Sequence, residues 1–264
     1  MEIAGYLAAL LIGVSLGLIG GGGSILTIPV LVYLFHIQPT IATGYSLFIV
    51  GCSSLAGAYK YYRRGYINFK AAFYFGVASI ITVLLVRKLL VPVIPDHFFM
   101  IGSLVVTKSL ATMLLFAVIM IVASISMIKK TVADKAYEKD QPIHLTKALI
   151  RGVEVGILTG LLGAGGGFLI IPVLIFSFHL PMKEAIGTSL LIIAMNSLFG
   201  FAGDLFHHQF DWTLLLPLTA IAVTGTFIGR RLGQDLAADK LKKWFGWFVL
   251  VMGIYIIIHE IFLK

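Results

Sequence analysis

Residues 20–29 read GGGGSILTIP, and residues 163–172 repeat them as GAGGGFLIIP. Each copy runs on to a second short motif, GYS at residues 44–46 and GTS at residues 187–189. The two stretches align without a gap at an offset of 143 residues, and 14 of the 28 aligned pairs are identical. The chain is therefore an internal duplication.

The composition places both copies in a membrane. Of the 264 residues, 59% are hydrophobic and 12% charged, and the mean hydropathy is +1.01. A soluble domain of this size cannot hide so much apolar surface from water, so the lipid bilayer is the expected partner. The first apolar stretch begins at Ile3 without a basic region before it, which indicates a retained span rather than a signal peptide. The single Cys52 can form neither an internal disulfide nor a cysteine metal site alone.

The net charge of +8 reflects topology and not a nucleic-acid ligand. Of the 20 Lys and Arg residues, 14 fall in three segments between apolar runs, at 60–70, 129–147 and 230–243. Such clusters are typical of the cytoplasmic loops of membrane proteins. We therefore expect no nucleic-acid partner.

Ten apolar segments divide the chain into two equal sets, at 3–19, 24–36, 40–59, 70–90 and 104–128, and at 148–162, 168–179, 184–203, 212–229 and 244–262. The expected domains are a first membrane repeat at 1–128, a cytoplasmic linker at 129–147 and a second repeat at 148–264. A helix needs about 20 apolar residues to cross a bilayer. The second segment of each set is shorter, so we expect it to form a broken or re-entrant helix with the segment before it.

The basic loops favour opposite orientations for the two repeats. If each repeat contributes five crossings, all three basic segments fall on one side and both termini lie outside. The segment 60–70 has four basic residues and no acid, whereas its counterpart, 203–213, carries Asp204, Asp211, His207 and His208. The predicted fold is an all-helical polytopic membrane protein made of two inverted-topology repeats of about five segments each.

The glycine runs predict a break near the middle of the membrane. Each glycine costs roughly 1 kcal/mol relative to alanine inside a helix, so the helix ends there. Unwound backbone at this depth normally lines a cavity. If Ser24 and Gly167 begin the next helices, their amide ends would favour an anion. The alternative is close packing of helices through glycine.

Small hydroxyl side chains follow about 23 residues after each break. They can donate hydrogen bonds to an anion without adding charge at membrane depth. The alternative is a hydroxyl bonded to its own helix backbone. Cys52 is a weaker candidate for the same wall. The candidate substrate-binding residues are Gly20, Gly21, Gly22, Gly23, Ser24, Tyr45, Ser46, Gly163, Gly165, Gly166, Gly167, Thr188, Ser189 and Asn196.

The duplicated motifs resemble those of the TauE/SafE sulfite exporter family. The resemblance rests on Gly-x-Gly-Gly-Gly, then Pro, then Gly-Thr-Ser, given twice, with Phe210-Asp211-Trp212 after the third segment of the second repeat. It covers nearly the whole chain. It implies a transporter of small sulfur-containing anions, such as sulfite, thiosulfate or sulfoacetate, in the cytoplasmic membrane. Tyr45 departs from the pattern where the second copy has Thr188.

Other ionisable residues are expected at helix ends. His36 and His179 occupy equivalent positions, as interfacial residues or as a proton relay. Lys108 and Glu154 lie close enough to helix ends to reach the surface. Arg230 and Arg231 align with Arg87 and Lys88 and should mark helix ends. No buried carboxylate stands out as a coupling site. Proton coupling is one option among several, and no pattern indicates an oligomeric state.

Two other classes of function were weighed. A cation or metal transporter could use the histidines with Asp204, although cation sites in membranes usually place carboxylates or carbonyls at the centre. An intramembrane serine hydrolase could pair Ser189 with His207 or His208. The chain lacks His-Glu-x-x-His, Gly-x-Ser-x-Gly and a cysteine cluster, so we expect no catalytic residues, no metal site and no cofactor.

Overall fold

The computed structural model describes residues 2–19, 23–95, 97–101, 104–128, 145–162, 166–206, 208–233 and 238–262. The helices of the first repeat are α1 (Glu2–Ile19), α2 (Ser24–Tyr33), α3 (Pro39–Tyr62), α4 (Phe69–Leu85), the π-helical turn η1 (Val86–Leu90), α5 (Val91–Val93) and α6 (Lys108–Ile128). Those of the second are α7 (Leu145–Leu162), α8 (Gly167–Phe178), α9 (Met182–Asp204), α10 (Trp212–Gly233) and α11 (Ala238–Phe262). Each predicted apolar segment overlaps one of these helices.

The fold is all-helical as predicted, apart from one short hairpin. Strands β1 (His97–Ile101) and β2 (Leu104–Thr107) pair antiparallel, with His97 opposite Thr107 and Ile101 opposite Leu104. The segment predicted at 104–128 therefore begins as a strand and turns helical only at Lys108. The two strands contain Phe98, Phe99, Val105 and Val106, and aromatic and β-branched residues favour extended backbone.

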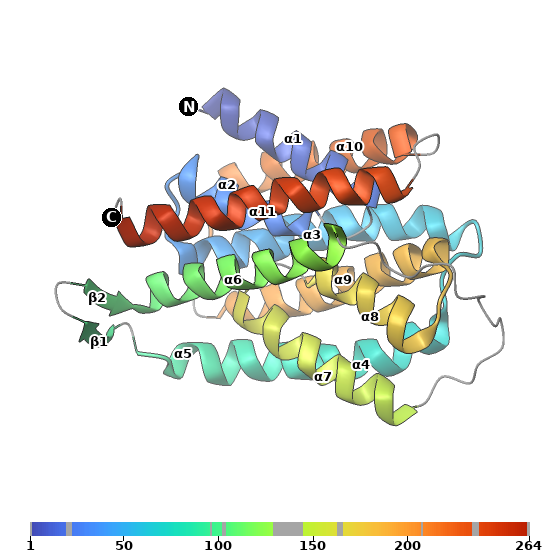
Figure 1. Ribbon diagram of the computed structural model, residues 1–264, viewed down its shortest axis with the longest axis horizontal. Coiled ribbons are helices and arrows are strands. Elements are labelled where there is room, and N and C mark those ends of the chain that lie inside the picture. The colour runs from blue at the N-terminus through green and yellow to red at the C-terminus, as the bar shows by residue number, and fades with distance from the viewer. Residues whose placement is uncertain are drawn as a thin grey trace.

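Four helices in the described parts of the chain are long and apolar enough to cross a membrane, judged by length and composition. They occupy 39–62, 69–93, 183–204 and 212–232. The helices run roughly along one axis, and the start of α1, the end of α11 and the β1–β2 hairpin lie at the same end of the bundle (Figure 1). The turn between α3 and α4 and the end of α10 lie at the opposite end. The basic residues of the α3–α4 turn and those at the end of α10 thus lie at the same end of the bundle.

The two repeats are interlocked. Helix α1 packs along α10, and α4 packs along α7, so the first helix of each repeat lies against the fourth helix of the other. Helix α3 packs on α9, and α6 on α11. One hydrophobic core joins α3, α9 and α10 with residues of α1 and α2, and a second joins α4, α7, α8 and α9 with Val50 of α3.

Glycines make the α1–α10 and α4–α7 contacts close. A side chain on Gly13 of α1 would overlap the backbone of Ala222, and one on Gly156 of α7 would overlap the backbone of Ser79. These two contacts are equivalent at the repeat offset of 143 residues. Gly17 and Gly160 complete a Gly-x-x-x-Gly pattern in each helix, the usual device for close helix packing in membranes.

We expect Gly13→Ala to lower the free energy of unfolding by about 1–3 kcal/mol, the usual cost of overpacking. Gly76→Ala is the matched control, because the nearest atom to a methyl group there is a side-chain carbon of Ile192 at 3.9 Å. Both variants gain the same helix propensity, so their difference in thermal unfolding in detergent isolates the close approach. Equal unfolding temperatures would contradict this account of the packing.

Candidate functional site

The predicted helix starts after the glycine runs are confirmed. Helix α2 begins at Ser24, and α8 begins at Gly167. Helices α2 and α8 also contact each other. The candidate residues Gly20, Gly21 and Gly22, and Gly163 and Gly165, lie outside the described residues, and their part in binding stays a prediction.

The last residue before α8 must be glycine for two reasons. Gly166 has a positive φ of 67°, which residues with a side chain rarely adopt. A Cβ atom there would also overlap the Thr159 hydroxyl of α7. Gly166 is therefore packed closely against α7, the helix that precedes it.

The middle residues of the two short motifs connect the repeats to each other. The Tyr45 hydroxyl accepts a hydrogen bond from the Asp211 amide at 2.7 Å, and the Thr188 hydroxyl accepts one from the Asn68 amide at 2.9 Å. These bonds are equivalent at the repeat offset. The Tyr45 hydroxyl thus holds the start of α10 in the second repeat, and the Thr188 hydroxyl holds the start of α4 in the first. Tyr45 departs from the family pattern, but its longer side chain makes the contact that is equivalent to the one made by Thr188.

Asn68 and Asp211 also cap these helices. The Asn68 side chain accepts a hydrogen bond from the Ala71 amide, and the Asp211 carboxylate accepts bonds from the amide and hydroxyl of Thr213. The bonds from Thr213 hold the pKa of Asp211 below its usual range. Asparagine and aspartate are preferred N-caps for this reason.

We expect Tyr45→Phe to lower the free energy of unfolding by about 0.5–1.5 kcal/mol, the usual contribution of one hydrogen bond. Tyr59→Phe is the control, because Tyr59 lies on the same helix and is exposed. Thermal unfolding in detergent measures both. If the two variants unfold at the same temperature, the Tyr45 bond contributes nothing to joining the repeats.

The motif serines do not meet. Contacts of Gly57 with Leu190 and of Gly200 with Leu47 show that α3 and α9 pack antiparallel. Ser46 therefore lies level with the last part of α9, about 18 Å along that helix from Ser189 at 1.5 Å per residue. Ser189 donates to the Ile186 carbonyl of its own helix at 2.8 Å, so this hydroxyl is bonded to its own helix backbone. Ser46 is buried and has no partner among the described residues.

Four buried polar side chains, two on α3 and two on α9, lie between the levels of the two motif serines along these helices. Ser53 and Ser54 of α3 are equivalent to Asn196 and Ser197 of α9 at the repeat offset. All four are fully buried. Asn196 donates to the Ser79 hydroxyl of α4 at 2.6 Å. We call these four residues the central polar row.

Most polar atoms of the central polar row are without a partner. The hydroxyls of Ser53, Ser54 and Ser197 and the Asn196 amide oxygen make no hydrogen bond with described residues. Each unsatisfied buried group costs about 1–3 kcal/mol. Groups kept at that cost in the middle of a membrane protein are typical of a substrate path. Sequence reasoning identified Asn196 but missed the three serines, although their equivalent positions in the repeats were a visible signal.

His36 and His179 follow the ends of the short helices α2 and α8. His36 and His179 are exposed, with positive φ values of 55° and 53°. The Ile37 amide donates to the Leu31 carbonyl, and the Leu180 amide donates to the Leu174 carbonyl, which is the bond that ends a helix in a Schellman motif. The expectation that the two histidines lie at helix ends is confirmed.

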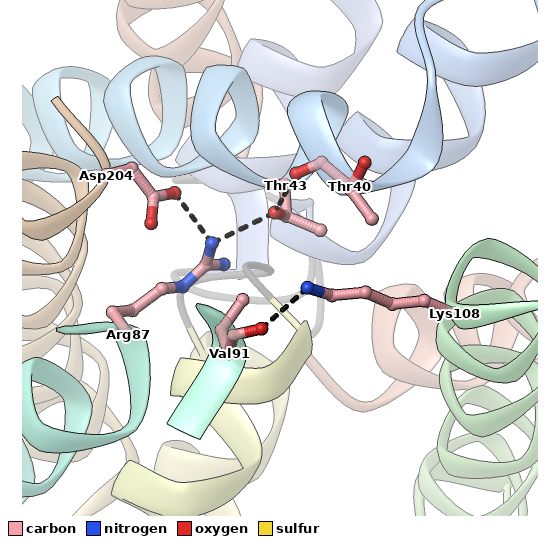
Figure 2. Close-up of polar contacts among 6 residues, drawn as sticks. All are labelled: Thr40, Thr43, Arg87, Val91, Lys108 and Asp204. Carbon is pink, nitrogen blue, oxygen red and sulfur yellow. Dashed lines mark hydrogen bonds and ion pairs between the residues drawn. The ribbon is translucent and has the colours of Figure 1, made fainter. Parts of the chain in front are cut away.

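A buried ion pair, which the sequence analysis did not indicate, includes a carboxylate. Asp204 and Arg87 are 3% and 2% exposed, and Arg87 Nη1 donates to Asp204 Oδ2 at 2.6 Å (Figure 2). Both residues lie near the end of an apolar run, where sequence alone indicates exposure. Glu260 of α11 is buried too, at 1% exposure, and accepts a bond from Tyr33. Lys108, expected to extend to the surface, donates to the Val91 carbonyl at 2.6 Å.

Among the residues that the structure describes, those of the two alternative functions are not gathered into a site. Within the described ranges, no group of three or more His, Cys, Asp or Glu is placed to hold a metal ion. Ser189 lies near the start of α9, whereas His208 follows its end, and His207 lies outside the described residues. The hydrolase pairing of Ser189 with His208 therefore has no geometric support.

Comparison with known proteins assigns the family. The sequence model of the sulfite exporter TauE/SafE family matches residues 5–256. The chain belongs to the TauE/SafE family. It is 30% identical over 252 residues to a probable membrane transporter protein of Xylella fastidiosa, covering 94% of this chain and 91% of the relative. It is 28% identical to the probable membrane transporter protein YdhB of Bacillus subtilis, covering 90% and 92%.

The chain is also 25% identical to a probable membrane transporter protein of Methanocaldococcus jannaschii, over 94% of this chain and 92% of the relative. The resemblance stated from the motifs is thus confirmed. This TauE/SafE protein is a membrane transporter with several helices able to span a membrane.

Proposed function

We propose that this protein carries small sulfur-containing anions across the cell membrane by alternating access, in the direction of export. The central polar row is the observation that supports the proposal best. Its serine hydroxyls offer uncharged hydrogen-bond donors in the interior, and an oxyanion supplies the acceptors that hydroxyl donors need. The family description, sulfite exporter, supports the same class of substrate.

The buried charges of the bundle suit an anion better than a cation. Arg87, which donates to Thr43 near the start of α3, already holds Asp204 and retains unpaired donors. The short helices α2 and α8 contact each other, and helix starts favour negative charge. A site of donors without an excess of carboxylates selects anions.

Uptake into proteoliposomes tests the substrate class. Sulfite, thiosulfate and sulfoacetate are offered separately, with and without an imposed pH gradient. Saturable uptake of one of them supports the proposal, and a response to the gradient adds proton coupling. If none of the three is transported by a protein that is folded and inserted, the substrate class is wrong.

We expect Ser54→Ala and Ser197→Ala each to raise the KM for the transported anion about fivefold to tenfold, the equivalent of one lost hydrogen bond. Neither variant should unfold at a lower temperature, because alanine removes a buried hydroxyl that has no partner in the protein. Ser124→Ala is the matched control, since Ser124 is equally buried and donates to the Ile121 carbonyl of its own helix. An unchanged KM in both test variants would remove the central polar row from the substrate path.

We further infer that the two repeats have inverted topology. Exchanging the two repeats converts the α1–α10 pair into the α7–α4 pair. The same exchange maps the antiparallel pair of α3 and α9 onto itself. A twofold axis that relates antiparallel equivalent helices lies across them, in the plane of the membrane. The shared end of the 60–70 and 230–233 basic segments supports the same arrangement.

Labelling of single cysteines tests this topology in a Cys52→Ser background. Cysteine placed at the exposed positions Arg64 and Arg231 should react with an impermeant maleimide only from the cytoplasmic side. Cysteine at Gln209, in the exposed loop before α10, should react only from outside. Labelling of Arg64→Cys and Arg231→Cys from opposite sides would rule out the inverted arrangement.

A further inference from the structure

Two arginines at equivalent positions of the repeats are buried in the bundle. Arg87 of η1 is 2% exposed and Arg230 of α10 is 9% exposed, and the two align at the repeat offset. Burying a guanidinium is costly unless its donors are bonded, and in a membrane such residues usually mark a path or a site. Arg87 also lies in a π-helical turn, a distortion found frequently at functional sites.

Arg87 uses only part of its guanidinium within the protein. Its Nη1 atom donates to Asp204 Oδ2 at 2.6 Å and to the Thr43 hydroxyl at 3.0 Å. Figure 2 shows the guanidinium directed from η1 toward these two side chains. Its Nε and Nη2 atoms are buried and have no partner among the described residues. Thr43 is itself committed, because its hydroxyl donates to the Thr40 carbonyl at 2.7 Å.

The unused edge of Arg87 has a specific shape. Nε and Nη2 present two parallel N–H groups, which match two oxygens carried on one atom, as in sulfite, a sulfonate or a carboxylate. The ion pair with Asp204 is made through the other nitrogen, so an oxyanion can bind without displacing the carboxylate. Asp204 therefore orients the guanidinium, and its negative charge opposes tight binding of a second anion.

Arg230 is the counterpart at the other end of the bundle. The position equivalent to Asp204 is Tyr61, and the Arg230 guanidinium carbon lies 5.6 Å from the centroid of the Tyr61 ring. Its Nη1 atom is buried without a partner, and none of the ion pairs among the described residues includes Arg230. Arg230 is therefore held by a cation–π interaction with the Tyr61 ring, whereas Arg87 is held by a carboxylate.

Each arginine lies beside one of the short motifs. A side chain on Gly44 would contact the Asp204 carboxylate, and one on Gly187 would contact Tyr61. Gly44 and Gly187 therefore make room for the residues that hold Arg87 and Arg230. The central polar row lies between these two places along α3 and α9.

We propose that Arg87 and Arg230 bind the transported oxyanion at the two ends of its path, through the donors that the protein leaves unpaired. Asp204 acts as a positioning residue that holds Arg87 and keeps its affinity low enough for release. The inference rests on the proposed function, since it assigns residues and a two-oxygen ligand geometry to that transport.

The test compares Arg87→Lys with Asp204→Asn in proteoliposomes, using the anion that the wild-type protein transports. Arg87→Lys keeps the charge but loses the two-donor edge, so KM should rise about tenfold, the equivalent of a charge-assisted hydrogen bond. Asp204→Asn keeps an oxygen that accepts from Nη1 but removes the competing negative charge, so KM should fall. The maximal rate should fall as well, because the more tightly bound anion is released more slowly. Arg230→Lys should raise KM for transport from the opposite side.

Opposite shifts in KM separate binding from a structural role. If the ion pair only holds the fold, both variants lose thermal stability and neither lowers KM, and the inference is overturned. Arg151→Lys is the matched control, because the Arg151–Glu154 pair is exposed and should leave KM unchanged. If Arg87→Lys does not fold, Asp204→Asn alone decides, and an unchanged or raised KM overturns the proposal.

The outcomes also separate this inference from the proposed function. A wild-type protein that transports none of the sulfur-containing anions overturns both. A wild-type protein that transports one of them, with an unchanged KM in Arg87→Lys, overturns only the role of the arginines. Protection against thermal unfolding by the same anion in detergent gives an independent measure of binding, and it should be weaker in Arg87→Lys than in the wild-type protein.

Discussion

The close packing of α1 on α10 and of α4 on α7 is the constraint on which the rest of the structure depends. Lipid chains are as apolar as leucine, so helices in a membrane associate through close contact of their surfaces rather than through hydrophobic burial. Gly13 and Gly156 provide that contact at equivalent positions. Because each pair takes one helix from each repeat, neither repeat can complete its packing alone, and α3 and α9 are forced together between the pairs.

The antiparallel crossing of α3 and α9 decides which polar groups meet. It brings the central polar row to the middle of the bundle and moves Ser46 and Ser189 toward opposite ends. The second residues of the motifs, Tyr45 and Thr188, are occupied in holding the neighbouring helix starts. The duplicated motifs thus serve the joining of the repeats, and the unpaired hydroxyls of the central polar row are the ones we propose for the substrate.

The two ends of the bundle differ in chemistry although the backbone arrangement repeats. One end has an ion pair between Arg87 and Asp204, and the other has Arg230 over the ring of Tyr61. A carboxylate beside an arginine weakens its attraction for a second anion, whereas an aromatic ring leaves the positive charge uncompensated. A duplicated protein with such a difference can hold the same anion with different affinity at its two ends, a property suited to directional transport.

The sequence by itself determined the features that depend on local composition. Apolar length and basic segments indicate a membrane protein, and the duplicated motif indicates two repeats. The glycine runs predicted breaks in the helices because glycine is a poor helix former, and α2 and α8 begin at Ser24 and Gly167, within a residue of the apolar segments expected at 24–36 and 168–179. Only the tertiary structure decided the burial of Asp204 and Arg87, which lie 117 residues apart, and the bond of Asn196 to Ser79. A charge near the end of an apolar run is expected to reach water when its own helix alone is considered. Whether it does depends on the helices that pack around it, and that packing is set by contacts between segments distant in the sequence.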